Sequence, residues 1–264
     1  KLGATSCNQA GDCEAVFSYP MFRDLEREQS VFSGIAAHRL FGANLAYHGQ
    51  TLIGEGLLVS GSYFPVLEMQ PALGRLLGPG DDQEIGQSPV AVLSYASWRQ
   101  RFNESPAVLN DTLIVNGHAL TIVGVAPPGF DGTTLAAKPQ VFIPITMRGL
   151  IQPGTSEAFG NRRSYWAYLF ARLKPGTSTA QAQAAVSGPY HNIINNIEAP
   201  LLTGISEQTM TRFKARQILV EEGARGQSNV HKQARAPLIL LLCVTSLVLL
   251  IACANVANLL LARA

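Results

Sequence analysis

Cysteine has the widest chemistry of any residue type in this sequence, because its thiol can form a disulfide, hold a metal ion or attack a substrate. Cys7 and Cys13 enclose a short loop that contains a glycine, so they could form a disulfide in an oxidising compartment outside the cytoplasm. The sequence leaves this pairing open. No histidine lies at ligand spacing to the pair, so we predict no metal site. Cys243 and Cys253 lie in an apolar run and are expected to act as small apolar side chains.

Motifs for covalent catalysis and for nucleotide binding do not occur in the sequence. A P-loop requires a Gly-Lys dipeptide, and the α/β-hydrolase nucleophile requires Gly-x-Ser-x-Gly; neither is present. Gly54-Glu55-Gly56 has Val59 in place of the third glycine of a dinucleotide fingerprint, so it indicates a turn or bulge in a strand. Asp81 and Asp82 lie in a Gly/Pro turn, where aspartate bonds to nearby backbone. We therefore predict no catalytic centre, and no cofactor bound by this chain.

The remaining residues that could act in catalysis or bind a metal are the histidines and one pair of serines. The five histidines are scattered, and we expect them to lie at the surface or to be hydrogen-bonded; they are His38, His48, His118, His191 and His231. Ser60-Gly61-Ser62 indicates a strand-to-helix turn with Ser62 as the helix cap rather than a nucleophile.

Short strands and helices alternate in the first half of the sequence. Ser18 is expected to cap a helix with Pro20 in its first turn, because serine accepts a bond from the free backbone N–H groups there. Two extended segments, 35–47 and 52–60, follow on either side of a His48-Gly49-Gln50 turn. A second short helix is predicted near Ser62.

The second half continues this pattern. Asn116-Gly117 between apolar runs predicts a hairpin, because its turn requires positive φ at both residues. Ser178 with Gln181 three residues later predicts a capped helix, which Pro189 should kink or split. We also predict strands at 89–93, 141–145, 165–173 and 218–220, a helix after Ser94, and a polar loop at 149–163.

The charge of the chain is low and unevenly distributed. Only 14% of the 264 residues are charged, compared with roughly 25% in soluble globular proteins. Four of the basic residues lie within 225–264, which contains no acidic residue, so the other 16 basic residues face 18 acidic ones. A slightly acidic domain lacks the basic face that nucleic-acid binding requires.

The apolar excess is concentrated near the C-terminus. No charged residue occurs between Leu238 and Ala254, which predicts a membrane span over 238–262. Four small or polar residues recur at helical spacing on one face of it and are expected to pack against another helix; they are Ala252, Asn255, Asn258 and Ala262. The asparagines could instead reach the headgroup region. Because the sequence starts at Lys1 and stops directly after the span, we expect it to be part of a longer polypeptide.

Several stretches, from about residue 15 to the end, together resemble a known family. They are SYPMFRD at 18–24, VSGSYF at 59–64, VAVLS at 90–94, LTIVGVA at 120–126 and ACANVANLLLAR at 252–263. These stretches are similar to a MacB-like periplasmic core domain followed by the first helix of an FtsX-like permease domain. The last stretch is especially similar to the duplicated orphan permeases of acidobacteria.

The resemblance implies an α+β, two-lobed extracytoplasmic domain followed by one transmembrane helix. After a connector at 1–14, a porter-like βαβ lobe would comprise 15–76 and 150–226, with a mixed α/β lobe inserted at 77–149. Residues 227–237 would form a stalk that leads into the span.

The resemblance also implies a function. The chain would couple the movement of membrane helices to periplasmic lobes in efflux or export, with residues 1–236 outside the bacterial inner membrane. Implied partners are the other helices of the same permease, the lipid bilayer, a cytoplasmic ATPase subunit that would use the ATP, a second permease copy and a periplasmic adaptor. No nucleic acid is expected among them.

Two other classes of function stay open on the sequence alone. One is a membrane-anchored sensor or binding module without transport, which would leave the Asn255 and Asn258 face unused. The other is an anchored hydrolase.

The charges beside the span argue weakly against the orientation that the resemblance implies. Lys232 and Arg235 precede the span and would lie outside, against the positive-inside tendency.

Overall fold

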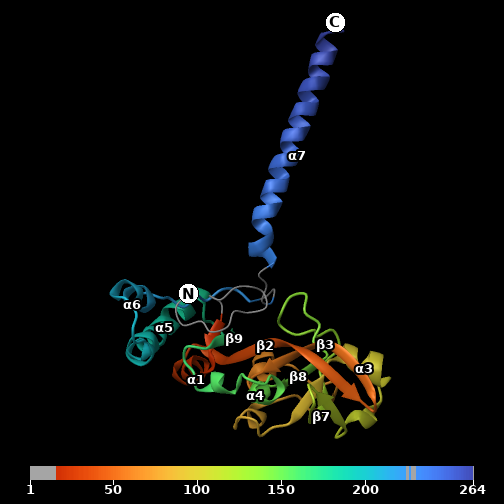
Figure 1. Cartoon of the computed structure of the whole chain (residues 1–264), viewed down its shortest axis with the longest axis vertical. Helices are drawn as coiled ribbons and strands as arrows, with labels where there is room; N and C mark the ends of the chain where they lie inside the picture. Colours follow the sequence, from red (N-terminus) through yellow and green to blue (C-terminus); the bar gives the residue numbers. More distant parts are fainter. Residues whose placement is uncertain (1–15, 224–225, 227–229, 264) are drawn as a thin grey trace. The chain divides into compact units, whose positions relative to one another are not determined.

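The computed structural model describes residues 16–223, 226 and 230–263. The chain divides into two units between Gln227 and Ser228. The first is a mixed α/β domain, and the second contains the long helix α7 (Val230–Leu261). Each unit is described by itself (Figure 1).

One nine-stranded sheet forms the centre of the domain. Its strand order is β1-β9-β2-β3-β8-β5-β7-β4, and β6 pairs with both β2 and β7. The pairs β3–β8 and β5–β7 are parallel, and the other pairs are antiparallel. The strands are β1 (Val16–Ser18), β2 (Phe32–Tyr47), β3 (Gln50–Val59), β4 (Leu73–Gly74), β5 (Val90–Leu93), β6 (Thr112–Val115), β7 (His118–Val125), β8 (Val141–Pro144) and β9 (Tyr165–Leu173).

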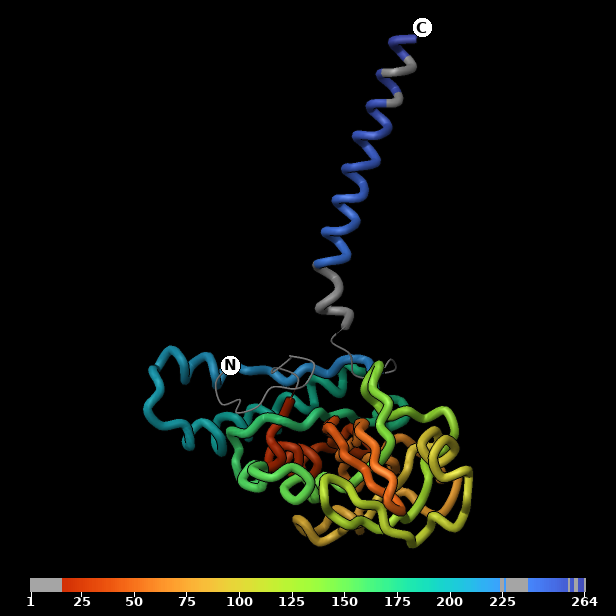
Figure 2. The backbone as a smooth tube through the Cα atoms, turned by 45° about the vertical axis from the view of Figure 1, so that its right-hand side comes forward, coloured from red at the N-terminus to blue at the C-terminus, as the bar shows by residue number. Residues whose placement is uncertain are grey.

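Short helices pack around this sheet. They are α1 (Tyr19–Glu28), α2 (Tyr63–Leu67), α3 (Tyr95–Phe102), α4 (Arg148–Ile151), α5 (Thr179–Asn192) and α6 (Glu207–Lys214). Single 3₁₀ turns occur at Pro79–Asp81, Pro106–Val108, Ile145–Met147, Ser156–Phe159 and Ala199–Leu201, and a π-helix at Ile193–Glu198. In both Figure 1 and Figure 2, α5 and α6 lie at one end of the domain and α3 at the other.

Three of the predicted helix caps form where the sequence predicts them, at Ser18, Ser94 and Ser178. The Ser18 hydroxyl accepts a hydrogen bond from Met21 N at 3.3 Å and begins α1. Ser94 caps α3 in the same way. Ser178 and Gln181 form a reciprocal capping box at the start of α5. These predictions are confirmed because a cap depends on residues only three apart in sequence.

Both predicted hairpins are also confirmed. The β2–β3 hairpin pairs Tyr47 with Gln50 across a turn in which His48 and Gly49 have φ values of 45° and 79°. In the β6–β7 hairpin, Asn116 and Gly117 have φ values of 49° and 86°. Positive φ at both turn residues matches the right-handed twist of the strands.

Asn116 has a second role that its motif does not reveal. Its side-chain oxygen accepts from Asn44 N at 2.8 Å, and its amide donates to Ile151 O at 3.1 Å. The turn therefore holds β6 beside β2 and the end of α4.

Four local predictions are wrong or incomplete. Ser62 does not cap α2; it donates to Ile35 O at 2.7 Å. The supposed polar loop at 149–163 contains the end of α4 and a 3₁₀ turn, which bury Ile151 and Phe159. Segment 218–220 is not a strand. Its backbone bonds to the Gln183 side chain instead of a neighbouring strand, because the Gln183 amide donates to Ile218 O and its side-chain oxygen accepts from Val220 N. Pro189 does not split the helix, because α5 extends through it to Asn192 and continues as the π-helix; the predicted kink stays a prediction.

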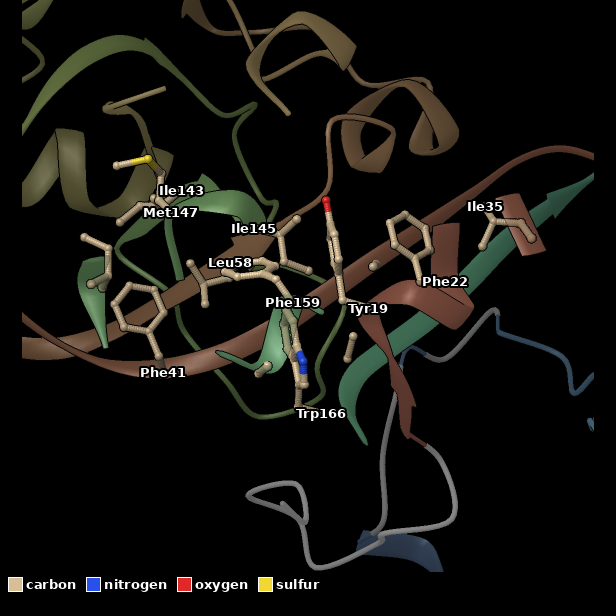
Figure 3. Close-up of a cluster of buried hydrophobic side chains, with 14 of the residues drawn as sticks. Tyr19, Phe22, Ile35, Phe41, Leu58, Ile143, Ile145, Met147, Phe159 and Trp166 are labelled. Carbon is tan, nitrogen blue, oxygen red and sulfur yellow. The ribbon is translucent and has the colours of Figure 1, made fainter. Parts of the chain in front are cut away.

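Aromatic side chains fill the core near α1 and β9 (Figure 3). Tyr19 meets Phe159 edge to face at 5.0 Å between ring centroids and stacks on Trp166 at 6.2 Å. Trp166 is fully buried. The same apolar cluster extends to Val108, Leu113 and Ile122 at the other end of the sheet. One sheet contains strands from both proposed lobes, and this cluster contains residues of both, so the lobe boundaries at 76/77 and 149/150 stay a prediction.

Candidate functional site: the apolar helix and three buried polar clusters

Helix α7 is long enough to cross a membrane and extend beyond it. At about 1.5 Å per residue its 32 residues span about 48 Å, and the hydrocarbon core of a bilayer is about 30 Å thick. Its apolar window, Pro237–Asn255, is 19 residues long with a mean hydropathy of 2.8, and none of it is buried within the described structure. An apolar surface of this size requires lipid or other helices around it. The helix is therefore a candidate membrane span.

The helix is continuous across the start of this window. Residues 230–236 have the same helical backbone as the apolar residues that follow Pro237. Proline cannot donate the bond that the Gln233 carbonyl would otherwise accept. At the edge of the apolar window water can satisfy that carbonyl, so the proline is tolerated there.

The predicted packing face lies on this helix. Ala252, Asn255 and Asn258 belong to α7, and the Ala262 N–H continues the helical bonding to Asn258 O at 3.0 Å. All four side chains are exposed in the described structure, so their packing role stays a prediction. Cys243 and Cys253 are free and exposed on α7. Cys7 and Cys13, the proposed disulfide, lie outside the described residues.

The first polar cluster, the Asp82 cluster, joins α1 to two turns. Arg23 donates to the carboxylate and to the carbonyl oxygen of Asp82, both at 2.8 Å, and Gly61 N donates to the same carboxylate at 3.0 Å. Burial raises the pKa of Asp82 to about 6, although the Arg23 charge acts in the opposite direction. Asp82 is thus a long-range anchor, which corrects the expectation of local bonding. Asp81 does bond locally, to Gly78 N and Arg75.

The second, the Glu198 cluster, joins α1, β9 and the π-helix. Arg162 lies 2.7 Å from the Asp24 carboxylate and 3.9 Å from that of Glu198. The Tyr165 hydroxyl donates to Glu198 at 2.7 Å. Burial raises the pKa of Glu198, and burial together with the Glu198 charge raises the pKa of Tyr165. Arg162 therefore pairs with both buried carboxylates, and Arg27, 2.8 Å from Asp24, is a second cation beside that carboxylate.

The third, the Trp166 cluster, brings two arginines together. The Arg148 guanidinium lies 4.0 Å from the centre of the Trp166 ring, and Arg39 donates to Trp166 O at 3.1 Å. Burial, and then the Arg39 charge, lower the pKa of Arg148 to about 10. The cation over the ring and the aromatic neighbours of Trp166 link α4 to β9.

His38 contradicts the expectation of a surface or hydrogen-bonded histidine. It is only 2% exposed on β2, its Nδ1 has no hydrogen-bond partner, and its ring stacks on Tyr168 at 5.5 Å between centroids. Burial lowers the pKa of His38 to about 3. His38 is therefore neutral in the folded domain at any pH near 7.

His38 and Asp82 should shift stability in opposite directions with pH. His38 contributes stability that is present above its ordinary pKa of 6.5 and is lost as pH falls, because only the unfolded chain takes up the proton. Asp82 contributes stability that is present below 3.8 and is lost as pH rises through about 6. In wild type, His38 should therefore lower the unfolding free energy at pH 5 relative to pH 8. We expect His38→Phe to remove this loss, which amounts to about 2 kcal/mol.

This expectation is checked by chemical denaturation at both pH values. A constant packing cost of the phenylalanine cancels in the difference between the two pH values. His118→Phe, at a partly exposed position of β7, is the control and should keep the wild-type pH dependence. An unchanged pH dependence in His38→Phe would show that His38 titrates normally.

The polar clusters do not form a metal or ligand centre. Among the described residues no three His, Cys, Asp or Glu side chains are placed to hold a metal ion. Gly54 and Gly56 lie inside β3, where a Cβ would clash with the side chains of Gln140 and Phe41, so these glycines serve packing. Cavities of about 10 and 60 Å³ lie beside the Glu198 cluster and beside α3. Both are well below the roughly 300 Å³ of a usual small-molecule site.

Comparisons with known proteins agree with this architecture. Residues 4–188 match the family described as MacB-like periplasmic core domain. The periplasmic region of MacB from Actinobacillus actinomycetemcomitans has a TM-score of 0.53 at 17% identity, with 67% of this chain and 74% of that chain covered. At this identity the likeness shows a shared fold. No curated protein matches the sequence.

Two further solved structures are similar over comparable lengths. The extracellular domain of the noncanonic ABC-type transporter YknZ from Gram-positive bacteria has a TM-score of 0.49 at 13% identity, with 66% of this chain and 82% of that chain covered. A domain of a permease protein from Porphyromonas gingivalis has a TM-score of 0.46 at 18% identity, with coverage of 65% and 75%.

Proposed function

Because the chain belongs to the family of MacB-like periplasmic core domains, we propose that it is the extracytoplasmic region of an ABC-transporter-type permease subunit. In this proposal α7 carries movement between the membrane and the domain during efflux or export. The observation that supports it most is the continuity of α7, which includes residues 230–236 and the apolar window in one helix.

Stiffness is the physical requirement for such coupling. A helix shifts as a unit, so a displacement at one end reaches the other end, whereas a flexible Gly/Ser segment absorbs it. The stalk proposed at 227–237 is helical from Val230 onward. It is therefore suited to transmit a displacement rather than only to tether the domain.

The remaining parts of the proposal follow the family. The porter-like lobe would comprise 15–76 and 150–226, and the inserted lobe 77–149. Helix α7 would be the first helix of an FtsX-like permease domain of the acidobacterial type, with its Asn255 and Asn258 face against other helices. Residues 1–236 would lie outside the inner membrane, and a separate cytoplasmic subunit would hydrolyse ATP. A second permease copy and a periplasmic adaptor would complete the assembly.

The coupling is tested with two insertions of equal length in the full-length protein. Seven Gly/Ser residues inserted after Gln233 should lower export, or resistance to the exported compound, to one tenth of wild type or less. Seven Ala-rich helical residues at the same site should preserve most of the activity, because seven residues keep the helix face within about 20°. Membrane expression of both variants is measured by immunoblot.

Activity close to that of wild type in both insertion variants at equal expression would contradict coupling through α7. The domain would then act as a tethered sensor or binding module. Loss of activity in both variants would show that the length of the stalk, and not its stiffness, is required.

A further inference from the structure

A small cavity lies where the β2–β3 hairpin, α3 and β6 meet. Its volume is about 60 Å³. Its apolar walls come from four strands and one helix; they are Leu45, Leu52, Leu93, Phe102 and Leu113. Figure 1 shows α3 beside the end of the two long strands, far from α5 and α6.

One polar atom in this wall lacks a partner. Ser97 lines the cavity and is only 4% exposed, and its hydroxyl oxygen has no hydrogen-bond partner. Buried hydroxyl groups in proteins are almost always hydrogen-bonded, because an unbonded one has lost its water without compensation. A bound group that accepts the hydroxyl proton would satisfy Ser97.

A positive charge lies one helical turn away. Arg101 also lines the cavity, and residues four apart share one face of a helix. Arg101 has no carboxylate partner among the described residues, unlike Arg99, which lies 3.5 Å from Glu104. The Tyr47 hydroxyl at the cavity wall is already used, because it donates to Asp111 at 2.7 Å.

We propose that this cavity binds a short aliphatic carboxylate. One carboxylate oxygen accepts a hydrogen bond from the Ser97 hydroxyl, and the Arg101 guanidinium pairs with the other carboxylate oxygen. The aliphatic tail lies against the leucines. The volume sets the tail length, since a dry cavity of about 150 Å³ accommodates benzene and this one has less than half of that. Benzene has six carbons, so by the same comparison a tail of two or three carbons fits this limit.

The same chemistry could come from a free short-chain acid or from the C-terminal residue of a peptide ending in alanine. The proposal does not depend on transport by the chain. It is tested on the full-length protein in nanodiscs by isothermal titration. The four probes are butanoate, its neutral amide butanamide, and the tripeptide Gly-Gly-Ala with a free or an amidated C-terminus.

We expect at least one carboxylate probe to bind, with its neutral counterpart at least tenfold weaker. Arg101→Gln should weaken binding at least tenfold and Ser97→Ala at least threefold. Arg99→Gln, two residues away on the same helix, should leave it unchanged. Because the Ser97 hydroxyl has no partner, Ser97→Ala should keep the wild-type unfolding temperature, which separates loss of binding from loss of fold. The tighter of the two carboxylate probes identifies the source of the ligand.

Three results would overturn the proposal. The first is that neither carboxylate binds at millimolar concentration. The second is that the neutral probes bind as tightly as the carboxylates, and the third is that Arg101→Gln leaves binding unchanged.

Discussion

Trp166→Ala should be among the most destabilising single substitutions in the domain, lowering the unfolding free energy by about 3–5 kcal/mol. Trp166 is fully buried, stacks on Tyr19, meets Phe159 edge to face at 6.0 Å, and carries the Arg148 guanidinium on its ring. Its removal leaves a cavity at the centre of the aromatic cluster and a buried cation without its ring. Denaturant unfolding of the chain in detergent, followed by circular dichroism, measures the loss.

Trp166→Phe is the matched control for this prediction. The indole N–H of Trp166 has no hydrogen-bond partner, so its loss leaves no polar group unsatisfied. A phenyl ring keeps part of the aromatic contact, and we expect the cost to be less than half of that of alanine. Equal costs for the two variants would show that the indole itself, and not the filling of the core, is required at this position.

Arg162→Ala should lower the unfolding free energy by about 3 kcal/mol at pH 8, because it removes the arginine that pairs with buried Glu198 and one of the two that pair with buried Asp24, which keeps Arg27. Asp24 and Glu198 are 5% and 3% exposed, and Arg162 is the cation between them. In the variant, protonation of Glu198, whose pKa is raised by burial, relieves the unpaired charge. The deficit against wild type should therefore shrink as the pH is lowered from 8 to 4.5.

The adjacent Arg163 provides the control. It is exposed, so Arg163→Ala should change stability by less than about 0.5 kcal/mol. A deficit in Arg162→Ala that is small, or that does not depend on pH, would mean that Arg162 contributes little to the compensation of Asp24 and Glu198.

The elements that the sequence predicted correctly are those specified by neighbouring residues. Caps such as Ser18 and Ser178 and turns such as Asn116-Gly117 use partners three or fewer residues away, so the pattern contains the whole interaction. The long apolar run that became α7 is likewise a local signal.

The features that the sequence did not reveal depend on contacts between distant segments. His38 is buried because β9 brings Tyr168 beside it, 130 positions later in the chain. Asp82 bonds to Arg23 across 59 positions. Segment 218–220 is not a strand because a glutamine of α5 takes its hydrogen bonds. Such pairings follow from the order of the strands in the sheet, which no local motif specifies.

The roles of the charged residues in the polar clusters could not be predicted from the sequence for the same reason. An aspartate pair in a turn or an isolated arginine is uninformative until the partners are known. Once they are placed, Arg23, Arg162 and Arg148 each have a structural role that holds α1, the π-helix or α4 in position. The part of the site that could be read from the sequence is the apolar helix and the order of the family motifs.

The central claim is that the folded domain lies outside the cytoplasm and is held at the membrane by α7. Its most direct test is a pair of reporters inserted after Gly154 of the full-length protein, where φ is +83° and the surrounding space is open. Alkaline phosphatase folds only outside the cytoplasm, and green fluorescent protein exported unfolded does not fluoresce there. We expect the phosphatase fusion to be active and the fluorescent fusion to be dark at equal expression. A dark phosphatase fusion with a bright fluorescent fusion would place the domain in the cytoplasm and contradict the account.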